Sequence, residues 1–179
     1  MFISIPENHI SSTNQQVAVG MQQSLPQTSI PEILGLLGLL KSKGGKEDIY
    51  KLAAELKMEF GTTLAVIRGA ELLGLVNTPG GDVVIEVLGE KLSRSRINTK
   101  KSVIKEQMQK IKWIQNIIEH LKTKDNCQTT REQFLQKLSE LNPDENSEQT
   151  FDTLVNWGRY AELFGYNDDT QIFYLDLGK

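Results

Sequence analysis

The sequence predicts a mainly α-helical protein with short β-hairpins, built from two related units, and two observations lead to this fold class. The first is an internal repeat, in which five residues recur at one fixed offset. They are Arg68, Ala70, Glu71, Leu72 and Gly74, which return as Arg159, Ala161, Glu162, Leu163 and Gly165. The second is the order of helix and turn signals, which runs the same way in both parts of the chain.

The first unit is predicted to begin with three helices. Ser29 opens the first of them with an S-x-x-E capping box, and Gly44-Gly45 is expected to end it. Apolar residues at spacings of three and four predict two more helices, at about 46–57 and 61–73. Gly74 then lies where a left-handed glycine commonly ends a helix.

A hairpin is predicted after these helices. Pro79-Gly80-Gly81-Asp82 is a tight-turn sequence, and a β-type run follows it: Val83, Val84, Ile85 and Val87. Three helices followed by a short hairpin is the order of a winged helix-turn-helix. The first unit is therefore expected to be a winged helix over residues 30–92.

The second unit repeats this order. A long helix is predicted at 99–122, a second at about 131–141 capped by Thr130, and a third capped by Ser147 and ended by Gly165. A turn at 167–170 then joins two short strands. The expected core residues are Ile104, Met108, Ile111, Ile114, Ile118, Leu121, Phe134, Leu138, Phe151, Leu154, Val155 and Ala161.

The predicted organisation is thus two tandem winged-helix units related by an internal repeat. The second unit spans 98–179, and a linker at 93–97 joins it to the first. Residues 1–29 are rich in Gln, Ser, Thr and Asn and are expected to form a flexible arm or linker.

Charge is distributed unevenly along the chain, whose formal net charge is −3. Residues 91–124 carry ten basic and two acidic side chains, whereas residues 125–179 carry four basic and eleven acidic ones. The basic segment is a candidate contact for an acidic partner or for membrane headgroups, and a solvated helix face balancing the acidic end is the alternative. Eight of the ten cations are the candidate contacts: Lys91, Arg94, Arg96, Lys100, Lys101, Lys105, Lys110 and Lys112.

Catalytic and metal-binding patterns are not found. The single cysteine, Cys127, excludes an intramolecular disulfide, and His9 and His120 have no neighbouring ligand set. The glycine-rich segment 41–46 is a helix end rather than a phosphate-binding loop. We expect no enzyme, no metal and no cofactor. Because no apolar run could span a bilayer and residues 1–20 do not read as a signal peptide, we expect a cytoplasmic protein.

Winged helices often bind DNA through the third helix and the wing, but these faces are predicted to repel phosphate. The third helices are expected to expose Arg68, Glu71, Thr62 and Thr63 in the first unit, and Glu148, Asp152, Asn156, Arg159 and Glu162 in the second. The wings carry Asp82, Glu86, Asp168, Asp169 and Asp176. We therefore do not expect sequence-specific DNA binding through them.

Protein contacts are expected at the repeated Arg-x-x-Glu and its surroundings. Arg68 with Glu71, and Arg159 with Glu162, are one turn apart and are predicted to pair on the helix surface. Tyr160 is a candidate exposed aromatic anchor, and Trp113 and Trp157 are expected in the core or between units. The predicted partner-binding residues are Arg159, Tyr160, Glu162, Arg68, Glu71, Lys100, Lys101 and Lys105.

Three segments resemble the AAA-associated C-terminal domain that follows the ATPase of nitrate/sulfonate/taurine-type ABC importers. They are Ile30-Pro31-Glu32-Ile33-Leu34-Gly35-Leu36-Leu37, Gly44-Gly45-Lys46-Glu47-Asp48-Ile49-Tyr50-Lys51-Leu52-Ala53 and Asn156-Trp157-Gly158-Arg159-Tyr160-Ala161-Glu162-Leu163-Phe164. The resemblance covers about residues 30–176 and does not include a nucleotide-binding part.

This resemblance implies a non-catalytic regulatory protein that docks on an ABC importer ATPase, or on an adjoining domain, in anion transport. It implies a cytoplasmic location, at the inner face of the membrane through the transporter. Two other functions stay open: a winged-helix transcription regulator, and a sensor that binds a small molecule between the two units. The transporter, the solute and the oligomeric state are not indicated by the sequence.

Overall fold

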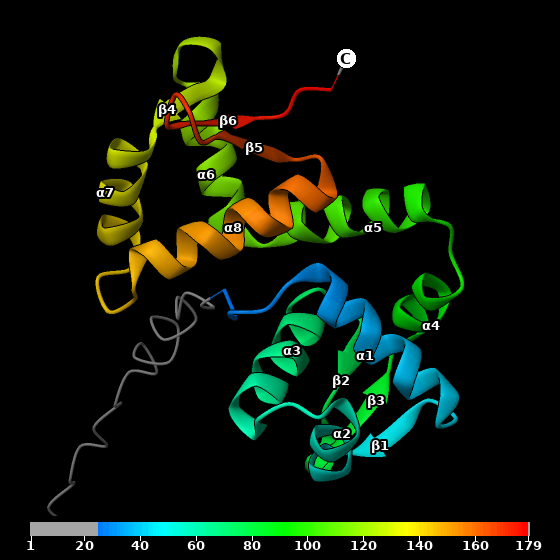
Figure 1. Cartoon of the computed structure of the whole chain (residues 1–179). Coiled ribbons are helices and arrows are strands. Elements are labelled where there is room, and N and C mark those ends of the chain that lie inside the picture. The colour runs from blue at the N-terminus through cyan, green and yellow to red at the C-terminus, as the bar shows by residue number, and fades with distance from the viewer. Residues whose placement is uncertain (1–24, 179) are drawn as a thin grey trace, which may run out of the picture.

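Two halves with the same order of elements make up most of residues 25–178, the part of the chain that the computed structural model describes (Figure 1). In each half a helix, a short strand, two helices and two further strands follow one another. The three strands form an antiparallel sheet, and the last strand lies between the other two. We call residues 30–85 the first half and residues 112–175 the second half.

The first half consists of α1 (Ile30–Ser42), β1 (Lys46–Asp48), α2 (Ile49–Leu56), α3 (Phe60–Leu72), β2 (Val76–Asn77), a 3₁₀ turn (Pro79–Gly81) and β3 (Asp82–Ile85). Two helices connect the halves: α4 (Val87–Ser93) and α5 (Ile97–Lys110). The second half consists of α6 (Lys112–Lys122), a 3₁₀ turn (Asp125–Cys127), β4 (Gln128–Thr130), α7 (Arg131–Leu141), α8 (Ser147–Ala161), β5 (Phe164–Asn167) and β6 (Ile172–Leu175).

The capping box predicted at the start of α1 is confirmed. The backbone N–H of Ser29 donates to the Glu32 carboxylate at 2.7 Å, and the Glu32 N–H donates to the Ser29 hydroxyl. Thr28 adds a third hydrogen bond to this carboxylate, at 3.1 Å. The hydrogen bond from the Ser29 N–H is the main cause that lowers the pKa of Glu32 below its ordinary value of 4.5.

Replacing Glu32 by Gln is expected to make the protein less stable at neutral pH by about 1 kcal/mol or less, since the carboxylate is partly exposed. The folded-state pKa is lowered, so the carboxylate stabilises the fold above pH 4.5 and loses this effect as the pH falls through the folded-state pKa. Urea unfolding at neutral and at strongly acidic pH measures this, and the two proteins should converge in acid. Asp144→Asn, in an exposed turn, should change neither curve.

Two predictions for the first half are wrong because strand pairing was not visible in the sequence. Residues 46–48 were expected to begin a helix, but they form β1, in which Lys46 lies opposite Val84 of β3. The helix starts after Asp48, whose carboxylate accepts the N–H groups of Tyr50 and Lys51. Val87, expected in the hairpin, instead begins α4, which was not predicted, and is 83% exposed.

The long helix predicted at 99–122 is broken at Ile111, whose ψ of 116° is extended. The predicted stripe is nevertheless correct, because Ile104, Met108, Ile111 and Ile114 are all buried. The break redirects the stripe, so that α5 packs against α8 while α6 lies under the second sheet.

The other helix boundaries of this half fall close to the prediction. Thr130 caps α7 by accepting the Gln133 N–H, as expected. Asn146, rather than Ser147, caps α8 through two hydrogen bonds from its first turn. Ser147 is the first helical residue, and its hydroxyl is hydrogen-bonded to Ser139.

The third helix of each half ends in the same way, at the repeated Gly74 in the first half but not at Gly165 in the second. At the end of α3, Gly74 has a φ of 66° and the Leu75 N–H donates to the Ala70 carbonyl at 2.9 Å. At the end of α8 the left-handed residue is Glu162, and the Leu163 N–H donates to the Gly158 carbonyl at 2.9 Å.

The positions that are structurally equivalent in the two halves therefore differ from those that the repeated residues of the sequence suggested. The carbonyls of Leu75 and Leu163 each accept the N–H that follows the last strand, from Glu86 and Asp176. Leu75 thus corresponds to Leu163, whereas the identities paired Leu72 with Leu163. The repeated residues are three positions apart in the structure, close to one helical turn. Gly165 was expected to end α8 but lies in β5, under the ring of Tyr174.

This arrangement predicts opposite effects of glycine at two equivalent positions. Gly74→Ala is expected to lower the free energy of unfolding by about 1 kcal/mol, because alanine is strained at a positive φ. Glu162→Gly should raise the free energy of unfolding by up to about 1 kcal/mol, because glycine adopts a positive φ without strain. The loss of the exposed ion pair with Lys101 reduces this gain slightly. Urea unfolding of both variants measures this, and a stabilised Gly74→Ala protein would contradict it.

The two halves meet at a crossing of α1 and α8, with Gly69 of α3 beside it. Trp157 of α8 is fully buried, and its indole N–H donates to the backbone oxygen of Thr28 at 2.7 Å. A β-carbon at Gly69 of α3 would lie 2.7 Å from Thr28 and 3.4 Å from the Trp157 ring. One cluster of buried apolar side chains runs through both halves.

Residues 25–28 lie in this crossing rather than apart from the fold. Leu25 and Thr28 are 3% and 7% exposed, and the Gln27 side chain is hydrogen-bonded to Gln149 of α8. The rest of the predicted arm, residues 1–24, lies outside the described residues. The predicted domain boundaries stay predictions.

Candidate functional site

The C-terminal end of α8 is held against α5 by two lysines. Lys101 forms an ion pair with the Glu162 carboxylate at 2.5 Å, and Lys105 donates to the Glu162 backbone oxygen at 2.6 Å. Both cations lie at the negative end of α8, where positive charge is favourable. The Glu162 side chain is 59% exposed, so the ion pair contributes little to stability and can exchange with other charged groups.

Arg159 lies one turn earlier on α8 and contacts the second hairpin. Its guanidinium donates to the Tyr166 backbone oxygen at 2.6 Å and to the Asp168 carboxylate at 3.1 Å. The predicted pair of Arg159 with Glu162 is therefore wrong, because each residue has a different partner. Because β5 is an edge strand, its Tyr166 carbonyl could accept a hydrogen bond from a strand of another chain. The hydrogen bond from Arg159 satisfies this carbonyl instead.

Arg68 and Glu71 lie on α3 of the first half, apart from the other predicted contact residues. Within residues 25–178 no ion pair joins them, and Glu71 instead accepts the Thr78 hydroxyl. Thr63 was expected to be exposed but is fully buried, and its hydroxyl donates to the Glu59 carbonyl. The predicted site residues therefore form two groups, one on each half.

Tyr160 is not the exposed anchor that was expected. Its ring packs against the hydrophobic core, and its hydroxyl is buried with no hydrogen-bond partner in the part of the chain that the structure describes. Burial raises the pKa of Tyr160, and the nearby charge of Lys101 opposes this effect. Tyr160 is thus a half-buried packing residue of α8, near Lys101 of α5.

The exposed face of α8 and the adjacent hairpin enclose an open groove of about 580 Å³. Most of its lining residues are polar, and Arg131 lies over the Phe151 ring at 5.3 Å. Its rim carries Arg131 and Arg159 together with Asp152 and Asp168, so the groove has no strong charge of either sign. The lining residues are Arg131, Phe151, Asp152, Val155, Asn156, Arg159, Tyr166, Asp168 and Gln171.

The cations of the basic segment do not share one environment. Arg94 is paired with Glu90, and Lys110 with Glu106 at 2.7 Å, in addition to the contacts of Lys101 and Lys105 with Glu162. At the end of α8 the basic segment thus meets the acidic C-terminal part of the chain, through the contacts of Lys101 and Lys105 with Glu162. Six cations of residues 91–124 form no ion pair within the described residues: Lys91, Arg96, Lys100, Lys105, Lys112 and Lys124.

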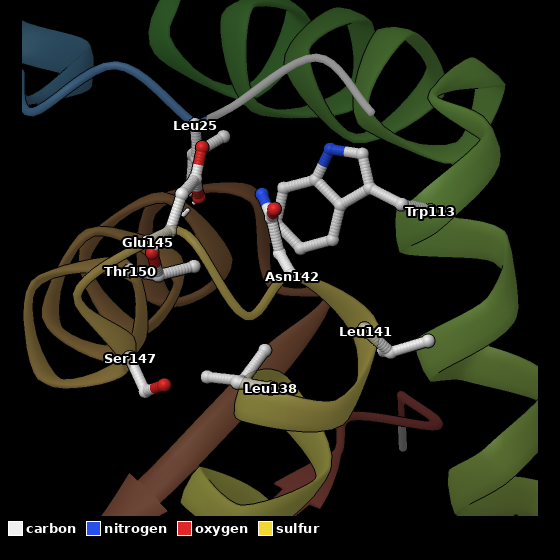
Figure 2. A pocket seen from close by; sticks show the side chains of 8 residues that line it. All are labelled: Leu25, Trp113, Leu138, Leu141, Asn142, Glu145, Ser147 and Thr150. Carbon is white, nitrogen blue, oxygen red and sulfur yellow. Dashed lines mark hydrogen bonds between the residues drawn. The ribbon is translucent and has the colours of Figure 1, made fainter. Parts of the chain in front are cut away.

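A small cavity of about 20 Å³ lies between residue 25, the start of α6 and the turn from α7 to α8 (Figure 2). Leu25 and Leu138 border it, and the Trp113 indole lies against it. The Trp113 N–H is buried and has no partner among the described residues. This volume is enough for about one water molecule. The sequence did not predict this contact, because Leu25 stands in a polar segment with no periodicity.

The described residues contain no group of His, Cys, Asp and Glu side chains that could hold a metal ion. His120 is half-buried, and desolvation, followed by the charges of Lys124 and Lys137, lowers its pKa. His9 lies outside the described residues. In the same part of the chain no helix has the length and apolar character needed to cross a membrane.

The described residues form a mainly helical fold with two small three-stranded sheets. Residues 50–167 match the family model of the C-terminal AAA-associated domain. The match covers more than half of the chain, and the chain therefore belongs to this family, as the resemblance predicted. No curated protein and no solved structure matches the chain.

Proposed function

We propose that the chain is a non-catalytic regulatory protein that docks on the ATP-binding subunit of a nitrate/sulfonate/bicarbonate-type ABC importer. The observation that carries this proposal is the family match over residues 50–167, which indicates an accessory domain linked to an ATPase. The protein would act at the cytoplasmic face of the membrane, through the transporter. The same match runs from α2 to β5 and so includes elements of both halves.

Each half is proposed to be a winged-helix unit, with boundaries at 30–92 and 98–179 and a linker at 93–97. The order of helices and strands supports this, as does the sheet order in which the last strand lies in the middle. In this description α3 and α8 are the third helices, and the hairpins β2–β3 and β5–β6 are the wings.

Docking is proposed to use the surface where the end of α8 meets α5. Lys101, Lys105 and Glu162 lie there, and Arg159 lies one turn earlier on α8. Because exposed ion pairs are worth only about 0–1 kcal/mol, a partner can replace one member at little cost. Arg68 and Glu71 on α3 are proposed as a separate second contact.

Regulation requires that the chain bind two states of the ATPase with different affinity, because equal binding shifts no equilibrium. A protein that prefers the open ATPase dimer would slow hydrolysis, and one that prefers the closed dimer would speed it. The proposal therefore predicts a change in the rate of ATP hydrolysis as well as binding.

The test is to add the chain to the matching ATPase and to measure both binding and hydrolysis. The informative variant is the charge swap Lys101→Glu/Glu162→Lys. It keeps an ion pair between α5 and α8 but exchanges the positions of the positive and the negative charge that a partner would meet. We expect wild type to bind and to change hydrolysis, and the swap to weaken binding at least about fivefold. Its matched control is the swap Lys137→Glu/Glu140→Lys on α7, where an ion pair of 3.4 Å is inverted in the same way. Wild-type protein that neither binds nor alters hydrolysis would exclude the proposal.

The two alternative functions receive less support. The exposed face of α8 carries Glu148 and Asp152, and its hairpin carries Asp168 and Asp169, which would repel DNA phosphates. An open hollow of about 310 Å³ does lie between the start of α1 and α8, but Glu32 and Asp152 line it. Such a lining disfavours an anionic solute.

A further inference from the structure

We propose that the chain recognises a carboxylate-bearing, acidic protein surface of its ATPase partner through the junction of α4 and α5. This inference rests on the proposed docking function and names the contact and the chemistry of the partner. We call the surface the basic joint and define it by Lys91, Arg94, Arg96, Ile97 and Lys100. Figure 1 shows the loop between α4 and α5 at one side of the molecule.

The basic joint brings together three cations that form no ion pair within residues 25–178 and one that does, Arg94. The cations further along α5 are held by carboxylates or by a helix end: Lys101 and Lys105 at Glu162, and Lys110 at Glu106. Lys91, Arg96 and Lys100 form no ion pair within residues 25–178, and Lys91 and Arg96 are exposed. Of the four cations of the joint, Arg94 alone forms an ion pair among the described residues, with the exposed Glu90.

The position of these cations is electrostatically unfavourable in the isolated chain. Arg96 is the N-cap of α5, its side chain makes no capping hydrogen bond, and the first turn contains no acidic residue. The N-terminal end of a helix carries partial positive charge and free N–H groups, so Arg96 and Lys100 raise the free energy there. A carboxylate supplied by a partner would relieve this repulsion and accept those N–H groups.

An apolar side chain lies within this ring of charge. Ile97, the first residue of α5, is 55% exposed, and Arg96 and Lys100 flank it along the helix. A large apolar contact surrounded by charge pairs is typical of a protein interface. A helix that lies on a membrane instead presents a wide apolar face with aromatic residues. The described α4 and α5 expose two large aliphatic side chains, Val87 and Ile97, on separate helices. These features favour a protein over a lipid surface.

The charge reversal Arg96→Glu/Lys100→Glu tests the inference. Acidic residues at the start of α5 are favourable for the helix, so the melting temperature should stay the same or rise. Binding to the ATPase is measured by biolayer interferometry at low and high salt. We expect the dissociation constant of the variant to rise at least about tenfold at low salt, and the salt dependence of binding to become weaker. The double reversal Lys112→Glu/Lys124→Glu is the matched control, because these cations also form no ion pair in the described chain and lie away from the joint.

Each outcome has a distinct meaning. Loss of binding in the joint variant, with the control within about twofold of wild type, supports the inference. Equal binding by all three proteins overturns the inference and leaves the proposed function in place. No binding by wild type overturns both. If the joint variant keeps its affinity for the ATPase but dissolves an oligomer that wild type forms alone in sedimentation velocity, the joint is a self-contact and the inference is wrong.

Discussion

Trp157→Ala is expected to lower the free energy of unfolding by about 3–5 kcal/mol, the range found when large buried aromatic residues are truncated. Trp157 is fully buried where α8 crosses α1, next to Gly69 of α3, so the cavity would lie between the two halves. The substitution also leaves the Thr28 backbone oxygen without its donor, which adds an unsatisfied buried acceptor. The total free energy of unfolding of a native protein is only about 5–15 kcal/mol. We therefore expect a large fall in the urea midpoint.

Trp157→Phe separates the hydrogen bond from the packing. Phenylalanine keeps much of the ring volume but has no N–H, so this variant should lose about 1–3 kcal/mol. Both variants are measured by urea unfolding followed by circular dichroism, since removing a tryptophan alters fluorescence directly. Trp113→Phe is a useful comparison, because the Trp113 N–H has no partner in the described structure. A Trp157→Phe protein as stable as wild type would show that the bond to Thr28 contributes nothing.

Gly89→Ala is expected to be the most damaging of the small substitutions, at about 3 kcal/mol. A β-carbon at Gly89 of α4 would lie 2.1 Å from the backbone oxygen of Leu75. That oxygen is fixed, because it also accepts the Glu86 N–H at 2.9 Å. Relief therefore requires α4 to move away from the first half. Movement of α4 would also displace the start of α5 and the basic joint.

The control for Gly89→Ala comes from α1. Gly35 and Gly38 are exposed helical glycines, and a β-carbon at either would meet no atom within 4 Å. Alanine at these positions should stabilise the protein by about 0.5–1 kcal/mol, because glycine is unfavourable inside helices. Thermal unfolding of the three single variants measures the contrast in sign. Equal effects at Gly89 and Gly35 would contradict the close approach of α4 to Leu75.

The contact residues were predicted less well than the helices, for reasons that lie in specific partners. The sequence correctly placed Lys101, Lys105 and Glu162 among the candidates, because charge and helical spacing are visible in it. It paired Arg159 with Glu162 by proximity along α8. In the structure Arg159 pairs with Asp168 of the β5–β6 hairpin, and Glu162 pairs with Lys101 of α5. Both partners are more than four residues away along the chain, so helical spacing does not predict them.

The burial of Tyr160 and of Leu25 could not be predicted for a related reason. An aromatic residue beside an exposed arginine gives no indication of which way the helix is turned. Only the tertiary packing around α8 buries the Tyr160 hydroxyl. Leu25 stands among polar residues, and its burial depends on the neighbouring α6 and the turn after α7.

The sequence by itself determined the features that depend on neighbouring residues. These include the capping box at Ser29, the cap at Thr130, the left-handed glycine at Gly74 and the apolar stripe from Ile104 to Leu121. Each is stabilised by contacts within one or two helical turns, so the residues that define it are adjacent in the sequence. The family was visible for the same reason, since its motifs are short and continuous.

Only the tertiary structure decided the features that require distant parts of the chain. Residues 46–48 became a strand because β3 supplies hydrogen bonds about 35 residues away. The helix at 99–122 broke at Ile111 because its two parts pack against different elements. Equivalent positions of the two halves were fixed by the carbonyls of Leu75 and Leu163, not by repeated identities. Strand pairing and packing of this kind depend on which elements meet in space, which local sequence does not specify.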